Sequence, residues 1–303
     1  MTNLFTLFAN NILPIFLAAG AGFLLSKSFN LNPRPISQVA FYIFIPCLVF
    51  NLLTTSNLTG NEILRIILFT IVSVLLLGLL TWALGKLFRF ERRLLVAVLL
   101  ATMFGNAGNF GLSLNLFAFG ETALAYASLY FVTITVLTYT LGIVLVSLGS
   151  TGLKEALAGL IKVPAIYALA AALLFNALHW KLPLPIDRTV SLLGDATIPV
   201  LIILLGIQLG ASRWDQRLLA LGLTNTVRLV VAPFLAIGLA LLMGIRASAM
   251  QAVVSQSATP TMVMTTLLAT EYDMEPAFVT AAVVTTTLLS PLTMTPLLAF
   301  LGA

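Results

Sequence analysis

The chain has 303 residues, of which 60% are hydrophobic and 8% are charged, and its mean hydropathy is +1.10. Because water-soluble domains usually carry about 25% charged residues, this composition excludes a soluble protein and indicates one that lies in a lipid bilayer. The formal net charge of +5 does not indicate a nucleic-acid partner, since the basic residues lie in short connections between apolar runs, where they orient membrane helices.

Crossing the hydrocarbon core takes about 20 apolar residues in a helix, and the sequence contains ten such runs. In chain order they lie near residues 4–26, 35–54, 62–87, 92–118, 122–149, 155–179, 187–210, 216–243, 247–270 and 276–301. Lipid offers the backbone no hydrogen-bond partner, and the runs are too long and too uniformly apolar for the alternating strands of a barrel. The sequence therefore predicts an all-α polytopic membrane protein with ten transmembrane helices.

The basic residues predict the orientation of these helices, because cytoplasmic connections collect Lys and Arg. If both termini lie outside, the inner connections hold 10 of the 15 basic residues, the outer connections hold four, and Arg228 lies inside a helix. We therefore expect an integral protein of the cytoplasmic (inner) membrane with both termini outside. The first run has no preceding basic residue and no clear cleavage site, so we expect a retained helix rather than a signal peptide.

The two halves of the chain show matching features. Residues 109–121 align with residues 259–271 at an offset of 150, and both segments are interrupted apolar runs that end in a glutamate. Pro14 and Pro164 share this offset, and a similar one separates Pro46 from Pro199. We therefore divide the chain into repeats 1–150 and 151–303. Each has five helices, an odd number, so the second must enter the membrane from the opposite face, which predicts an inverted repeat.

The interruptions in the fourth and ninth runs carry the chemistry. Residues 104–111 contain three glycines and two asparagines, and each glycine weakens a helix by about 1 kcal/mol relative to alanine. In residues 255–260, Pro260 lacks an N–H and pushes Thr259 out of the helical region. Broken backbone at membrane depth must face protein or a wet cavity, so we expect the two breaks to meet inside the protein.

Half-helix N-termini at such a meeting point present free N–H groups and a positive dipole end, and these favour an anion. The alternative for the glycines is close helix packing, and a single proline often only kinks a helix. Because both breaks lie at matched repeat positions and both carry polar residues, we favour a substrate site.

The motif Gly105-Asn106-Ala107-Gly108-Asn109-Phe110-Gly111, the Ile45-Pro46 and Ile198-Pro199 helices and the Ser257-Ala258-Thr259-Pro260 break resemble the auxin efflux carrier family. This family includes the plant PIN-formed carriers and many bacterial transporters of malonate, malate or other small organic acids. The resemblance covers essentially the whole chain, and the fourth run is its most specific part.

The resemblance implies a fold shared with bile acid sodium symporters. In that fold the first, second, sixth and seventh helices form a scaffold, and the third to fifth and eighth to tenth form a moving transport domain with the broken helices crossing at its centre. Plant members have a proline in both crossing helices, whereas here only the ninth run has one. The connection 149–162 is short, so the long regulatory loop of many plant carriers is absent.

By this resemblance and by position, Asn106 and Asn109 are the first candidates for substrate contact, because a neutral amide donates to a carboxylate without burying a charge. From the other half we expect Ser257, Thr259 and Pro260 to face them.

Three further polar residues lie on otherwise apolar runs. Asn51 is expected to close the pocket from the scaffold, and Asn115 and Gln208 are weaker candidates. The alternative for each is an interhelical hydrogen bond, worth about 0.6 to 2 kcal/mol.

Charged residues inside a membrane are expensive and usually functional. The candidates for coupling are Asp195, Glu121, Glu271 and Arg228. Proton coupling through these residues is one interpretation, and a structural ion pair between Asp195 and Arg228 is the alternative. His179, beside Trp180 at an interface, is interpreted as an anchor rather than a proton relay.

The sequence has no phosphate-binding loop and no cluster of metal ligands, so we expect neither an enzyme nor a cofactor or metal. We expect a secondary active transporter that moves a small organic anion, a mono- or dicarboxylate, by alternating access. Two alternatives stay open, a sodium-coupled symporter of bile-acid-like anions and a transporter-like sensor. A homodimer through the scaffold helices is an alternative to a monomer, and the direction of transport is not defined.

Overall fold

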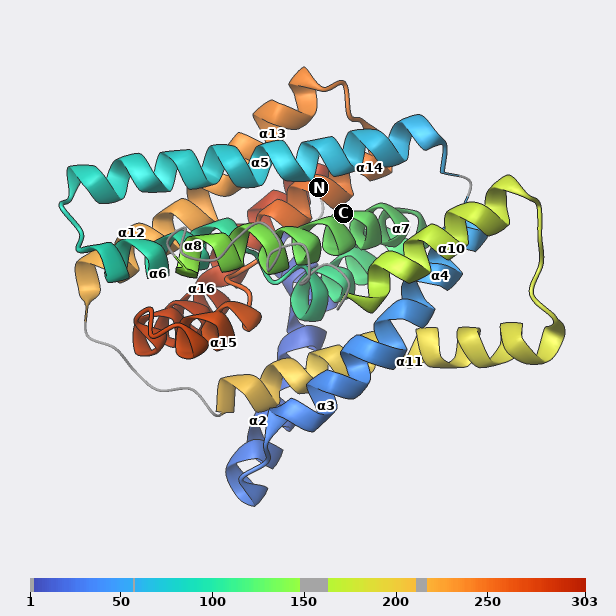
Figure 1. Ribbon diagram of the computed structural model, residues 1–303, viewed down its shortest axis with the longest axis horizontal. Coiled ribbons are helices and arrows are strands. Elements are labelled where there is room, and N and C mark those ends of the chain that lie inside the picture. Colours follow the sequence, from blue (N-terminus) through green and yellow to red (C-terminus); the bar gives the residue numbers. More distant parts are fainter. Residues whose placement is uncertain (1–2, 57, 148–162, 211–216) are drawn as a thin grey trace.

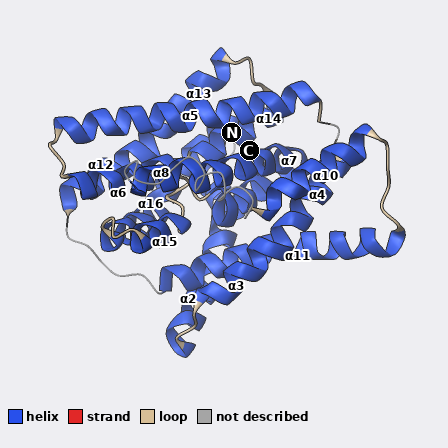
Figure 2. Cartoon of the chain, in the orientation of Figure 1, coloured by secondary structure: helices blue, strands red, loops and turns tan. Residues whose placement is uncertain are grey.

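The computed structural model describes residues 3–56, 58–147, 163–210 and 217–303, and regular structure in these ranges is helical apart from one isolated β-bridge (Figures 1 and 2). The elements in chain order are α1 (Leu4–Leu7), η1 (Phe8–Ile12), α2 (Leu13–Phe29), α3 (Pro33–Val39), η2 (Ala40–Phe44), α4 (Ile45–Thr55), α5 (Gly60–Leu87), α6 (Arg92–Met103), η3 (Ala107–Leu112), α7 (Ser113–Leu137), η4 (Thr138–Gly142), α8 (Ile143–Ser147), α10 (Pro164–Ala177), α11 (Leu184–Gly210), α12 (Leu218–Thr226), η5 (Val227–Val231), α13 (Ala232–Leu242), α14 (Ala247–Ser257), α15 (Met264–Glu271) and α16 (Pro276–Leu301).

Three of the π-helical turns precede prolines. The turns η1, η2 and η5 end two residues before Pro14, Pro46 and Pro233. A proline has no N–H to donate and its ring clashes with the carbonyl four residues earlier, so a widened turn lets the helix continue past it. As a result, the first, second and eighth predicted runs are each one continuous helical stretch.

Seven helices in the described residues are long and apolar enough to cross a membrane. One of them, Ala107–Val146, continues through Gly120, whose φ of 78° and ψ of −169° are not helical. This glycine separates the fourth and fifth predicted runs. The shorter α6, α14 and α15 are pieces of the two interrupted runs, and α10 is a 14-residue apolar helix.

Each of the ten predicted runs thus contains helix within the described ranges, but ten membrane crossings and an inverted orientation remain predictions. Several predicted features lie outside the described residues. They are the boundary between residues 150 and 151, the end of the fifth run, the start of the sixth run, and three basic residues of the inner connections, Lys154, Lys162 and Arg213.

For description, we divide the described helices into two groups by their packing; their roles as a fixed scaffold and a moving transport domain stay a prediction. The scaffold group consists of α1 to α4, α10 and α11, in which α11 packs on α2 and α4, and α10 packs on α4. The crossover group consists of α5 to α8 and α12 to α16, and fewer contacts join it to the scaffold group, mainly η3 with α11 and α7 with α4. In Figure 1 the scaffold group occupies the lower and right part of the view.

Glycines set the distance between α2 and α11. A Cβ atom on Gly206 would overlap the carbonyl group of Ala19, and one on Gly22 would overlap the carbonyl oxygen of Ile203. Small residues permit this backbone-to-backbone approach, which is a main source of helix association in lipid. The two longest helices of the scaffold group are therefore fixed to each other without intervening side chains.

Two ion pairs gather three connections at one end of α5. Arg93 Nη1 lies 2.9 Å from Asp273 Oδ2, and Arg217 Nη2 lies 2.7 Å from Glu275 Oε2. The starts of α6 and α12 therefore meet the connection between α15 and α16. This arrangement agrees with the prediction that these three connections lie on the same face of the membrane. Which face this is stays a prediction.

Candidate functional site

Both predicted helix breaks are present, and they cross. After α6 ends at Met103, the chain is extended at Phe104 and turns at Asn106 before η3 begins at Ala107. After α14 ends at Ser257, it is irregular until α15. Gly105 and Thr261 form an antiparallel bridge. The N–H of Asn106 donates to Pro260 O at 2.6 Å, and the N–H of Met262 donates to Phe104 O at 2.9 Å. Backbone N–H and C=O groups that lose their helical partners at one break thus form hydrogen bonds with the other break, as a lipid environment requires.

The residues at the breaks explain this local structure. A side chain at Gly105 would overlap Arg228 Nη2 and approach Thr259 Oγ1, so only glycine fits. Pro260 supplies a carbonyl to the bridge and has no N–H that would need a partner. The next residue, Thr261, is held by its N–H to Thr286 Oγ1 at 3.0 Å and by its hydroxyl to Ala101 O at 2.8 Å.

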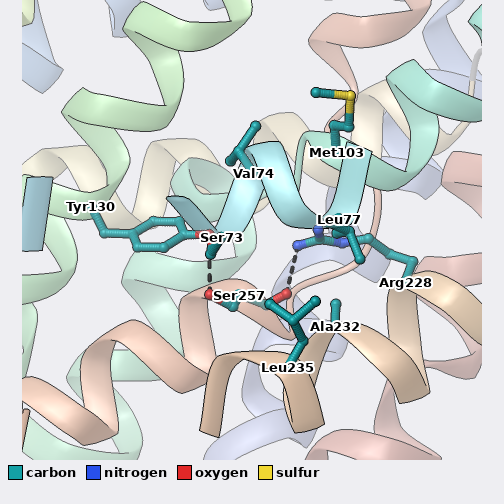
Figure 3. A pocket seen from close by; sticks show the side chains of 9 residues that line it. All are labelled: Ser73, Val74, Leu77, Met103, Tyr130, Arg228, Ala232, Leu235 and Ser257. Atoms are coloured by element: carbon teal, nitrogen blue, oxygen red, sulfur yellow. Dashed lines mark hydrogen bonds between the residues drawn. The ribbon is translucent and has the colours of Figure 1, made fainter. Parts of the chain in front are cut away.

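A buried arginine joins the two half-helices that enter the crossing. Arg228, in the turn η5, is 1% exposed. It donates from Nη1 to Thr102 O at 2.9 Å, from Nη2 to Ser257 O at 2.9 Å and from Nε to Thr259 O at 2.7 Å. Thr102 and Ser257 lie at the C-terminal ends of α6 and α14, where the helix dipole is negative. The guanidinium therefore neutralises both helix ends, and Figure 3 shows its bond to Ser257.

A polar cluster surrounds this arginine. Ser257 Oγ donates to Tyr130 Oη at 3.2 Å, and both residues line a cavity of about 10 Å³ together with Ser73 and Arg228 (Figure 3). This volume suffices for about one water molecule. This cavity beside the C-terminal end of α14 therefore has no room for an organic substrate.

The N-terminal side of the crossing has free donors. Asn106 immediately precedes η3 and is 3% exposed, and its Nδ2 has no hydrogen-bond partner. The N–H of Ala107 donates to Gly105 O at 2.8 Å. The next N–H groups, of Gly108 and Asn109, have no partner within η3, so the start of η3 adds these backbone donors beside the amide. A buried amide without a partner is costly, which makes Asn106 the clearest indication of a ligand position in the described residues.

Asn109 lies one turn further along and reaches the scaffold group. Its Nδ2 donates to Gln208 Oε1 on α11 at 3.0 Å, and Gln208 Nε2 donates to Ser37 Oγ on α3 at 3.5 Å. Asn109 and Gln208 are both half-buried. Gln208, a weak candidate from the sequence, is therefore in direct contact with a first-rank candidate.

The remaining polar candidates make structural contacts. Asn115 donates to Gly111 O at 2.8 Å and accepts from Ser255 Oγ at 3.1 Å, which is the interhelical bond given as its alternative. The hydroxyl of Thr259 donates to Gln256 O at 2.7 Å. With Ser257 bonded to Tyr130, neither hydroxyl donates to the two asparagines. Contact of Ser257, Thr259 and Pro260 with substrate stays a prediction.

Asn51 stays a prediction as well. It is half-buried on α4, and within the described residues no hydrogen bond links its side chain to the crossing.

The acidic coupling candidates lie away from the crossing. Glu121, Asp195 and Glu271 are all exposed on the described chain. The alternative of an ion pair between Asp195 and Arg228 is wrong, because Arg228 is buried and donates to carbonyl oxygens instead. A coupling role for these four residues is still untested.

Sequence reasoning missed the roles of Arg228 and Gln256. Gln256 Nε2 donates to Ala107 O at 3.2 Å and to Ala127 O at 3.1 Å, so it ties the start of η3 to α7. The available signal for Arg228 was its charge in an apolar run, but its carbonyl partners cannot be read from side-chain identity. The described residues contain no group of three or more potential metal ligands from His, Cys, Asp and Glu.

The long apolar helices and the crossed, polar helix breaks define a helical membrane transporter. Comparison with known proteins agrees, since the family model described as "Membrane transport protein" matches residues 7–155 and again residues 150–298. The chain belongs to this family, the auxin efflux carrier family, and the double match supports the internal repeat.

Two archaeal proteins are similar over most of their length. An uncharacterized transporter of Methanocaldococcus jannaschii is 25% identical over 281 residues, which cover 88% of this chain and 90% of that protein. An uncharacterized transporter of Methanothermobacter thermautotrophicus is 23% identical over 261 residues, which cover 84% of each chain.

Proposed function

We propose that this protein is a secondary active carrier that moves a small organic anion, a mono- or dicarboxylate, across the cytoplasmic membrane by alternating access. In this proposal the scaffold group stays fixed and the crossover group rocks against it, so that the crossing opens to one side and then to the other. The two repeats have opposite orientations, and both termini lie outside.

The observation that carries the proposal is the unpartnered Nδ2 of Asn106 at the start of η3. The N–H groups of Gly108 and Asn109, which follow in the first turn of η3 and have no partner within that helix, point from the same helix end. A carboxylate is a strong acceptor with two oxygens, and the positive end of the helix dipole favours it further. In our proposal Asn106 and Asn109 bind the carboxylate, and Ser257, Thr259 and Pro260 shape the crossing from the other repeat.

The position of Arg228 argues against the sodium-coupled alternative. In carriers with broken helices, unwound carbonyls and half-helix C-termini coordinate the cation. Here the corresponding carbonyls of Thr102, Ser257 and Thr259 already accept from the guanidinium. A sodium ion at this position would compete with the arginine for these carbonyl oxygens and would be repelled by its positive charge.

Counterflow in proteoliposomes tests the proposal. Vesicles loaded with malonate, malate or acetate should accumulate the same labelled acid, and protein-free vesicles should not. We expect Asn109→Ala to abolish accumulation while the purified protein keeps its thermal stability. Asn176→Ala is a matched control, because it removes a side-chain hydrogen bond to Leu53 O of 2.8 Å that lies inside the scaffold group. The proposal fails if a broad panel of carboxylates gives no counterflow.

Coupling is tested in the same vesicles. We expect uptake to be unchanged when potassium replaces sodium. With sodium fixed, an imposed pH gradient should change the rate if Asp195, Glu121 or Glu271 carries protons. Equal rates with and without the gradient would remove proton coupling, and a requirement for sodium would favour the symporter instead.

A further inference from the structure

Resting on the proposed function, we propose that Gln208 is a built-in stand-in for the substrate carboxylate. In the empty protein, the amide oxygen of Gln208 accepts the hydrogen bond from Asn109 that a substrate carboxylate would otherwise accept. This bond links the crossover group to the scaffold group, and we call it the latch. A bound carboxylate accepts from Asn109 in place of Gln208, so the latch is broken.

Three hydrogen bonds run through Gln208 in one direction. Asn109 Nδ2 donates to Gln208 Oε1 at 3.0 Å, Gln208 Nε2 donates to Ser37 Oγ at 3.5 Å, and Ser37 Oγ donates to Pro33 O at 2.9 Å. These bonds start at the crossing and end at the first residue of α3. A candidate substrate donor is therefore bound to the scaffold group through consecutive hydrogen bonds, and such bonds strengthen one another in a low-dielectric environment.

The packing of α11 fixes where Gln208 points. Gly206 and Gly210 flank it at a spacing of four residues, and both approach α2 so closely that added Cβ atoms would overlap Ala19 and Ser26. A residue two positions from each glycine lies on roughly the opposite side of the helix. The face that holds α11 on α2 thus directs Gln208 away from α2, toward η3.

The exchange of acceptors favours the substrate. A hydrogen bond to a carboxylate is roughly twice as strong as one to a neutral amide oxygen, so the substrate outcompetes Gln208 for Asn109. Once this bond is lost, the latch between the two groups is gone. Binding is then linked to domain motion because the ligand favours the unlatched state.

The latch is tested without any ligand. In a Cys47→Ser background, spin labels at Leu192→Cys on α11 and Leu79→Cys on α5 report the distance between the two groups by double electron–electron resonance, because both positions are exposed. We expect one narrow distance for the background and a broadened or second distance for Gln208→Ala. Asn176→Ala should match the background, since its bond lies within the scaffold group.

A double-mutant cycle separates the latch from a general loss of stability. Asn109→Ala removes the donor of the same bond, so it should reproduce the distance change of Gln208→Ala, and the double variant should add nothing to either single one. An unchanged distance in Gln208→Ala, or additive changes in the cycle, would overturn the proposal.

Malonate binding supplies the second readout. Loss of a neutral hydrogen bond corresponds to about a two- to tenfold change in an equilibrium constant, and we expect Gln208→Ala to bind malonate more tightly by this factor. Gln208→Glu places a carboxylate in the same position and should abolish malonate binding. A merely structural glutamine would weaken binding in both variants, and this result would contradict the stand-in role.

The two proposals fail separately. If malonate and the other acids do not bind, the proposed substrate class is rejected, whereas the distance measurements still decide whether the latch exists.

Discussion

The backbone N–H of Asn106 donates to the carbonyl oxygen of Pro260 at 2.6 Å, and this bond ties the broken helix of the first repeat to that of the second. Because it uses backbone atoms, the crossing leaves the Asn106 side chain free for another partner. Within this one residue, the backbone N–H makes a structural contact and the side-chain amide is the candidate binding group. Variants of the surrounding residues can therefore test structure and binding independently.

Arg228 is expected to hold the crossing together. Arg228→Met leaves the carbonyl oxygens of Thr102, Ser257 and Thr259 without this donor, and each buried unsatisfied acceptor costs about 1 to 3 kcal/mol. Removing a buried charge offsets part of this loss, so we expect a net destabilisation of about 2 to 4 kcal/mol in unfolding of the detergent-purified protein. Arg246→Met, at an exposed position, should change stability by less than about 0.5 kcal/mol. Parent-like stability of Arg228→Met would refute this role.

Asn106 and Asn115 form a matched pair of buried amides with different expected effects. Asn106→Ala removes a donor that has no partner, so stability should hold while carboxylate binding falls at least about tenfold. Asn115→Ala breaks bonds to Gly111 and Ser255 and should cost about 1 kcal/mol with little effect on binding. Thermal unfolding with and without malonate measures both quantities. The reverse pattern would move the site away from Asn106.

The glycine contact between α2 and α11 predicts opposite effects for two alanine substitutions. Gly206→Ala places a methyl group into the Ala19 backbone and should destabilise the protein by about 1 to 3 kcal/mol. Gly20→Ala has no atom within 4 Å of the added Cβ, so it should stabilise α2 by up to about 1 kcal/mol. Equal effects in unfolding experiments would show that α2 and α11 do not approach this closely.

A side chain at Gly105 should cost less when Arg228 is shortened. Gly105→Ala overlaps the guanidinium and Thr259 Oγ1 and is expected to destabilise the protein by about 1 to 3 kcal/mol. In the Arg228→Met background only the overlap with Thr259 Oγ1 is left, so the loss in the double variant should be smaller than the sum of the two single losses. Full additivity in unfolding measurements would indicate that the two residues are not in contact.

The helix breaks were predictable because glycines and a proline act on the backbone locally. Residues 104–111 and 255–260 contain these residues, and both breaks fall there. The widened turns before Pro14, Pro46 and Pro233 have the same local cause, yet a proline alone does not distinguish a kink from a π-helical turn. Local chemistry thus predicts where a helix changes but not how it continues.

Contacts between distant segments could not be predicted in the same way. Arg228 binds backbone carbonyls, which every residue possesses, so no pattern of side chains indicated its partners. The contact of Gln208 with Asn109 depends on how α11 packs against η3, which the sequence does not indicate. Charge alone makes an ion pair between Asp195 and Arg228 an alternative, whereas burial places the two residues in different environments.

A single guanidinium serves helix ends from both repeats, and this asymmetry bears on the ancestry of the chain. Two separate copies of one repeat, related by a twofold axis, would bring either two arginines or none to this place. The position 150 residues before Arg228 is Gly78, which has no side chain to offer. A single cationic cap therefore requires the two repeats to differ in sequence, which two identical copies cannot do.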